Sequence, residues 1–196
     1  HERVVVQDGA QLLALTRLLR KNLRNYAKTH ADERPRAVVF FPSEKEAKDA
    51  IESLRDSLWG EHKVCVMLPE IGVNPLGIMN DFKNSETSVM LATPNSVRGL
   101  DFPNVTHVYS LFLPVDDPRE YIHLAGRVGR VGQEGRVLGD GGHVVSLIKD
   151  TDVNSFDALS SALGFSYEDK TIESEEIVDW EQDEDLTGDN IDVEKA

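Results

Sequence analysis

The chain has 196 residues, of which 40% are hydrophobic and 29% are charged, with 21 basic residues against 35 acidic ones. This length fits one domain with an appendage, the hydrophobic content excludes a wholly disordered chain, and no apolar run approaches the roughly 20 residues of a membrane-spanning helix. The single cysteine, Cys65, excludes an internal disulfide and a cysteine-based zinc site, so we expect an intracellular, reducing compartment and no membrane partner.

Six short apolar runs predict β-strands, and most lack the polar alternation of a half-exposed strand, as expected of strands buried on both faces of a sheet. In chain order they cover residues 4–6, 37–41, 63–68, 88–92, 105–111 and 143–148. Between them, apolar residues at three- to four-residue spacing predict helices. These cover residues 12–26, 43–58, 75–82, 117–122 and 153–163. The second helix begins with a capping box, Ser43 to Glu46.

Alternating strands and helices with short links predict βαβ units, and right-handed crossovers then give a parallel sheet sandwiched by helices. In such sheets ligands bind beyond the carboxyl ends of the strands. The segments to inspect are therefore those that follow each strand: FPSE, MLPE, ATPNSVRGLD and FLPVDD. Three other residues carry weaker signals. We expect His107 to be a packed or edge histidine rather than a ligand. We expect Trp59, which closes the second helix, to be a core or rim residue rather than a base-stacking platform, and Cys65 to be buried and inert.

The segment 93–101, TPNSVRGLD, follows a predicted strand directly. It places a hydroxyl, backbone amides, the cation Arg98 and the carboxylate Asp101 at a strand's carboxyl end. A backbone-rich loop suits a phosphate group, and Asp101 is able to accept a hydrogen bond from a ribose hydroxyl. The alternative is a polar loop that contains an Arg98–Asp101 ion pair.

The segment 121–135, YIHLAGRVGRVGQEG, combines glycines with two arginines. Arg127 and Arg130 are three residues apart, so on a helical turn they point the same way. Two rigid guanidinium groups on one face match a polyphosphate. A dinucleotide fingerprint does not fit, because the glycines lack the GxGxxG spacing and no strand leads directly into them. The alternative is a glycine-rich loop with solvated arginines.

Together, and in this order, the two segments resemble motifs V and VI of the C-terminal RecA-like domain of DEAD-box ATP-dependent RNA helicases. Motif V of that family reads roughly T-D-x-A-x-R-G-[IL]-D, and TPNSVRGLDFPNVTHV fits this frame without a gap. Motif VI reads Y-x-H-R-x-G-R-x-x-R, and YIHLAGRVGR fits it. Upstream, AVVFFPSEKEA resembles motif IV. The resemblance covers residues 1–165, so we expect a RecA-like domain there and an acidic tail at 166–196.

The resemblance implies a role for each matching residue. Asp101 and Gly99 would lie at the ATP ribose, and Arg127 and Arg130 would reach the γ-phosphate, with Arg127 as the favoured arginine finger. His123 would couple this domain to a partner lobe. Thr93, Arg98 and Ser43 would lie near RNA or the contact between lobes. The implied ligands are therefore RNA and ATP with Mg²⁺, and the implied partner is an N-terminal RecA-like lobe that holds most of the ATP.

Several positions depart from the family pattern. The Asp after Thr93 is Pro94 here, and the first arginine of motif VI is Leu124. The stretch 67–82 lacks the His-Gly and Gln-x-x-Arg elements that grip RNA, and a glycine-rich stretch is added at 136–143. The residues that face ATP in the family are kept, whereas several of the residues that contact RNA are absent. A degenerate, non-catalytic scaffold that binds RNA or protein in a larger assembly therefore remains an alternative, as does a helicase that acts on DNA.

The chain has no GxxxxGK[ST] phosphate loop and no strand that ends in a DEAD-like carboxylate pair. Without those parts an arginine finger has no bound phosphate to stabilise, so we expect this chain alone to be inactive as an ATPase. It begins with His1 rather than Met, and we expect it to be a fragment or a processed chain.

The C-terminal residues carry almost all of the net charge. Residues 151–196 contain 15 acidic and 2 basic residues, which leaves 20 acidic and 19 basic in residues 1–150. From Glu168 onward little periodicity remains, which is typical of a solvated acidic extension. This tail either solubilises the protein, mimics nucleic acid, or docks on a basic protein partner through Ile177, Val178 and Trp180.

Overall fold

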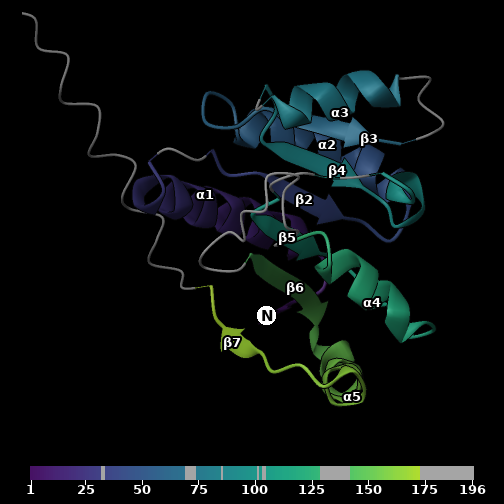
Figure 1. Cartoon of the computed structure of the whole chain (residues 1–196). Helices are drawn as coiled ribbons and strands as arrows, with labels where there is room; N and C mark the ends of the chain where they lie inside the picture. The colour runs from purple at the N-terminus through teal and green to yellow at the C-terminus, as the bar shows by residue number, and fades with distance from the viewer. Residues whose placement is uncertain are drawn as a thin grey trace, which may run out of the picture.

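The computed structural model describes residues 1–31, 34–68, 74–84, 86–100, 102, 105–128 and 142–172. Its seven strands form one sheet in the order β3-β4-β2-β5-β6-β1-β7, and every pairing is parallel, as predicted (Figure 1). The strands are β1 (Glu2–Val6), β2 (Ala37–Phe40), β3 (Val64–Met67), β4 (Val89–Ala92), β5 (His107–Ser110), β6 (His143–Lys149) and β7 (Glu168–Lys170).

In the part of the chain that the structure describes, five α-helices cover the two faces of this sheet (Figure 1). They are α1 (Gln11–Thr29), α2 (Glu44–Ser57), α3 (Pro75–Lys83), α4 (Pro118–Ala125) and α5 (Val153–Leu163). Apolar residues of α1 and α2 share one core cluster, and those of α3, α4 and α5 share a second one on the opposite face. This confirms the predicted sheet between two helix layers. Among the helices that the structure describes, none combines the length and apolarity that a membrane crossing requires.

Strand β2 shows why the apolar runs do not alternate with polar residues. Successive side chains of a strand point to opposite faces. Ala37 and Val39 therefore join the cluster beneath α1 and α2, while Val38 and Phe40 join the cluster beneath α3 to α5. A strand in the middle of a two-faced sheet needs apolar side chains at every position.

The helix starts follow the polar residues that precede them. The Ser43 hydroxyl accepts a hydrogen bond from the Glu46 backbone N–H at 3.2 Å, which confirms the predicted cap of α2. Asn74 and Asp117 cap α3 and α4 in the same way, and a proline occupies the start of both helices. These polar capping residues therefore determine where the three helices begin at the edge of the sheet.

The sheet extends beyond the predicted domain boundary at residue 165. Strand β7, at Glu168–Lys170, pairs with β1, although the sequence placed these residues in the acidic extension. An exposed edge strand is held by backbone hydrogen bonds, so it requires no apolar run. Arg3 also binds Asp169 through two nitrogens, at 2.6 and 2.9 Å, and Asp157 of α5 at 2.6 Å. The folded unit consequently reaches Ile172, which packs against the cluster beneath α1 and α2.

Three sequence expectations concern single residues. His107 is packed, as expected: it is 2% exposed, and its ring stacks on His143 at 5.0 Å. Cys65 is half-buried, and desolvation raises the pKa of its thiol to about 11, so it stays protonated and unreactive at neutral pH. Of the two places expected for Trp59, the structure excludes the core, because its side chain is 85% exposed, and places the residue in the lining of a groove. Trp59 lies beyond the end of α2, so it is not on the buried face of that helix.

Candidate functional site

The loop after β4 is held in one conformation by its own polar groups. The Thr93 backbone N–H donates to the Ser96 hydroxyl at 3.0 Å, and that hydroxyl donates to the Thr93 carbonyl oxygen at 3.0 Å. Asn95–Val97 then form one turn of 3₁₀ helix, and Gly99 has φ +75°. Glycine adopts this left-handed conformation at little steric cost. The loop therefore turns sharply where the sequence predicts a close approach to a ligand.

Helix α4 delivers Arg127 to that loop. Tyr121 and Leu124 are buried in the core and fix the helix, and the chain turns at Gly126, where a Cβ atom would lie 2.9 Å from the Ile122 carbonyl oxygen. The guanidinium of Arg127 then donates to the Leu100 carbonyl at 2.7 Å and to the Val97 carbonyl at 3.4 Å.

The guanidinium of Arg127 lies buried between the loop after β4 and an aromatic ring. The side chain is only 9% exposed, and its guanidinium lies 5.4 Å from the centre of the Phe102 ring. Carbonyl oxygens and an aromatic face both stabilise a cation. These contacts fasten the end of α4 to the loop after β4.

A small crevice of about 30 Å³ lies between the loop and α4. Its lining residues are Pro94, Val97, Arg98, Glu120, His123, Leu124 and Arg127. Arg98 and His123 are exposed at its mouth. The crevice is too small to enclose a nucleotide, so it suits contact with phosphate groups presented by another surface. Among the described residues that line it are two arginines, a histidine and the carboxylate of Glu120, and they include no serine, threonine or cysteine nucleophile.

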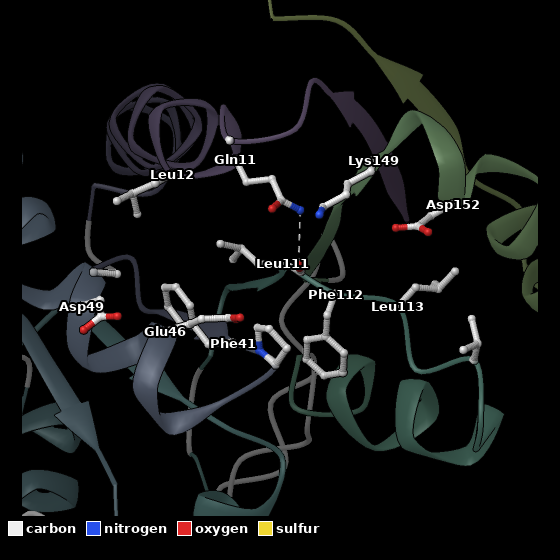
Figure 2. Close-up of a pocket in the computed structure, with 14 residues that line it drawn as sticks. Gln11, Leu12, Phe41, Glu46, Asp49, Leu111, Phe112, Leu113, Lys149 and Asp152 are labelled. Atoms are coloured by element: carbon white, nitrogen blue, oxygen red, sulfur yellow. Dashed lines mark hydrogen bonds between the residues drawn. The ribbon is translucent and has the colours of Figure 1, made fainter.

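A larger groove of about 540 Å³ lies beyond the carboxyl ends of the central strands, as predicted for this fold (Figure 2). Leu12, Phe41, Phe112, Leu113 and Val115 give it apolar walls. Figure 2 shows Gln11 reaching from α1 toward Leu111, and its amide donates to the carbonyls of Leu111 at 3.3 Å and Leu147 at 3.4 Å. These bonds tie the start of α1 to the ends of β5 and β6.

The charged groups of this groove are mostly acidic. Glu46, Asp49 and Asp152 line it, and its lysine, Lys149, is paired with Asp8 at 2.7 Å. The ion pair lowers the pKa of Asp8 and raises that of Lys149. Carboxylates repel a phosphate backbone. The groove therefore suits RNA less well than the cationic crevice does.

The structure brings four of the predicted site residues together: Arg98, His123 and Arg127 line the crevice, and Thr93 shapes its loop. Gly99 lies in the same loop. Ser43 lies elsewhere, beside the groove, and its hydroxyl is engaged in capping α2. Asp101 and Arg130 lie outside the described residues. Within the described parts of the chain, no cluster of three or more His, Cys, Asp or Glu is placed to hold a metal ion.

Sequence reasoning missed two groups that build the site. The carbonyls of Val97 and Leu100 bind Arg127, and backbone acceptors carry no sequence signal. The ring of Phe102 beneath Arg127 was also missed, although an aromatic residue beside Asp101 was visible in the sequence.

Comparison with known proteins agrees with this geometry. The model of the family "helicase conserved C-terminal domain" matches residues 14–132. ATP-dependent RNA helicase DBP3 of Mycosarcoma maydis is 34% identical over 134 residues, which are 63% of this chain and 22% of that protein. ATP-dependent RNA helicase RhlB of Enterobacter sp. (strain 638) is 29% identical over 137 residues, 67% of this chain and 29% of that protein. The chain thus spans less than a third of these relatives.

A solved structure, domain 2 of the DEAD-box helicase Mss116p bound to an RNA duplex, superposes with a TM-score of 0.72. It is 22% identical and covers 89% of this chain and 65% of that one. This similarity confirms the RecA-like fold that the motifs predicted.

Proposed function

The chain belongs to the helicase conserved C-terminal domain family, with DEAD-box RNA helicases as its relatives, and from this premise we propose that it is the C-terminal lobe of an ATP-dependent RNA helicase. The observation that carries the proposal is the pair of hydrogen bonds that the Arg127 guanidinium donates to the Val97 and Leu100 carbonyls. It joins motifs V and VI into one preorganised cationic surface at the carboxyl edge of the sheet. A preorganised cation stabilises developing negative charge without reorganising during the reaction.

In this proposal ATP is the substrate, and an N-terminal lobe holds most of it. Asp101 and Gly99 contact the ribose side, and Arg127 and Arg130 face the γ-phosphate when the lobes close. Arginine fingers of this kind contribute about 10³–10⁵ in rate. Arg127 has a further part in our account, because it also holds the loop that carries Gly99 and Asp101 against α4.

The described residues do not fit a Mg²⁺ ion. Mg²⁺ prefers oxygen ligands, usually carboxylates together with substrate phosphates. Arg98, His123 and Arg127 dominate the crevice, with Glu120 as its carboxylate. We therefore assign the ion that accompanies ATP to the N-terminal lobe and route no step of this lobe's action through it.

RNA would lie along the loop after β4, at Thr93 and Arg98, with His123 at the contact between the lobes. Two departures from the family pattern reduce the number of polar groups available to bind RNA. Leu124 is buried in the core, where the family has an arginine, and Pro94 offers no backbone donor. The acidic groove beside Ser43 reduces it further. We therefore expect weak RNA binding that strengthens only when the lobes close.

The test is the ATPase rate of the complete protein with and without single-stranded RNA, beside single-stranded DNA of the same sequence. We expect turnover that RNA raises and DNA does not, because the 2′-hydroxyl separates the two. We also expect no turnover from the present chain alone. Turnover that DNA stimulates equally would favour a DNA-acting helicase, and no turnover in the folded complete protein would favour a scaffold.

A further inference from the structure

The groove beyond the carboxyl ends of the central strands combines a buried apolar base with an exposed apolar rim. Phe41 and Leu111 belong to its base and are 3% and 8% exposed. Phe112 and Leu113 are half-buried, and Val115 at the end of this run is 58% exposed. The volume of about 540 Å³ lies within the roughly 300–1,000 Å³ that is typical of ligand-binding clefts. Several side chains of a ligand therefore find room and apolar surface here.

Carboxylates line two sides of this groove. Glu46 and Asp49 come from α2, and Asp152 comes from the 3₁₀ turn before α5. Figure 2 shows the two carboxylates of α2 on one side and Asp152 on the other, with Phe112 between them. No ion pair joins any of these three carboxylates to another residue in the described part of the chain. They are therefore free to pair with a cationic ligand.

The charges of the groove sum to a negative value. Lys149 binds Asp8 at 2.7 Å, so it does not neutralise the carboxylates of the lining. Four carboxylates, those of Asp8, Glu46, Asp49 and Asp152, against one ammonium group leave a net charge of −3. The starts of α1, α2 and α5 also line the groove, and each helix start carries about half a positive charge. These partial charges offset about half of the negative charge, so the groove stays negative.

A negative groove with apolar surface disfavours two occupants and favours a third. Carboxylates repel RNA phosphates. The chain's own residues 173–196 contain 11 acidic residues and one basic one, so the groove repels them as well. A segment with basic side chains on both sides of an apolar one matches the charge and the apolar surface together.

We propose that this groove is the docking site for a basic segment of a partner protein, a property separate from the proposed function in ATP turnover. In the docked state an apolar side chain lies against Phe112 and Val115, and basic side chains pair with the carboxylates on both sides. Each exposed ion pair contributes up to about five-fold in affinity and is weakened by salt. Burial of the apolar side chain supplies the rest. Tight binding therefore requires both kinds of side chain in one segment.

The experiment measures fluorescence anisotropy of rhodamine-labelled peptides with the whole 196-residue chain at low salt. The first peptide, RRLFRR, carries both kinds of side chain. We expect it to bind at least ten-fold more tightly than RRSSRR, which has the same charge and no apolar side chain. The acidic peptide EELFEE should not bind measurably, because the groove repels its carboxylates.

Neutralising the groove tests the electrostatic part. Glu46→Gln, Asp49→Asn and Asp152→Asn together remove three ion pairs and should weaken the binding of RRLFRR about ten-fold. The Asp152 side chain makes no capping hydrogen bond to α5, so its amide should not unfold that helix.

A matched control neutralises three exposed carboxylates that do not line the groove. Asp56→Asn, Asp81→Asn and Glu86→Gln together make the same change in net charge and should leave the affinity for RRLFRR unchanged. Equal losses in the groove variant and the control would show that net charge alone attracts the peptide, and would overturn the proposal.

A second variant tests the apolar part. Because Val115 is 58% exposed, Val115→Ser leaves the core intact. It should weaken RRLFRR several-fold and leave RRSSRR unchanged. Equal affinities of these two peptides for the wild type would overturn the proposal, as would preferential binding of EELFEE, which would assign the groove to an acidic ligand. No readout involves ATP or RNA, so failure here is distinct from failure of the proposed function.

Discussion

The guanidinium of Arg127 donates to two backbone carbonyls and lies over an aromatic ring, so it fastens the loop after β4 to the end of α4. The sequence predicted the cation but not its restraint. Because Arg127 holds this loop in the folded state, Arg127→Ala should lower the stability of the domain. Loss of two bonds from a charged donor should cost about 1–3 kcal/mol.

His107 should make the stability of the domain depend on pH. Burial lowers the pKa of its imidazole to about 3 from the usual 6.5. The unfolded chain takes up a proton below pH 6.5 and the folded chain does not, so stability is full above pH 6.5 and is lost as the pH falls toward 3. Between pH 7 and pH 5 we expect the free energy of unfolding to drop by about 2 kcal/mol from this residue.

The measurement is urea unfolding at both pH values for the wild type, His107→Asn and the exposed-site control His123→Asn. His107→Asn should remove most of the drop between pH 7 and pH 5, whatever it does to stability at pH 7. The control should keep it. An unchanged drop in His107→Asn would contradict the assignment.

Among the elements, β7 is tied to the rest of the fold by Arg3 in addition to its backbone pairing with β1. Its guanidinium binds Asp169 of β7 and Asp157 of α5, and lies 4.5 Å from the centre of the Tyr167 ring. The ion pair lowers the pKa of Asp169 and raises that of Arg3. Because both carboxylates are about half exposed, we expect Arg3→Ala to cost about 1–3 kcal/mol rather than the full value of a buried pair.

Hydrogen exchange localises that loss. In Arg3→Ala the amides of Glu168–Lys170 should lose their protection while those of β2 keep theirs. Lys149→Ala, which breaks an exposed ion pair with Asp8, should leave β7 protected and serves as the control. Protection of β7 that survives Arg3→Ala would show that backbone pairing alone holds the strand.

The elements differ in how far the sequence predicted them. Strands β2 and β4 are buried on both faces, and α1 has one buried face, so hydrophobic periodicity found all three. The caps at Ser43 and Asp117 located two helix starts. Strand β7 was not predicted because its three residues are charged and exposed. It is held by backbone hydrogen bonds to β1 and by Arg3, which is distant in sequence. Trp59 lies just beyond α2, so helical periodicity could not decide between the core and a rim position for it.

At the scale of the whole molecule, charge is separated by region. Residues 1–150 are close to neutral, while the residues after 150 are strongly acidic. Within the body, the crevice contains Arg98 and Arg127, and the large groove contains Glu46, Asp49 and Asp152. The composition located the acidic segment, whereas the separation of charge between the crevice and the groove follows from the fold.

The central claim is that this lobe completes an ATP site through Arg127. Its most direct test is the RNA-stimulated ATPase rate of the complete protein carrying Arg127→Ala, beside Arg119→Ala as an exposed arginine in the first turn of α4. Unfolding measurements on both variants identify the temperature at which each is folded. Our account predicts that Arg127→Ala lowers the rate by about 10³ or more while Arg119→Ala stays near the wild type. A folded Arg127→Ala protein with turnover within a few-fold of the wild type would contradict it.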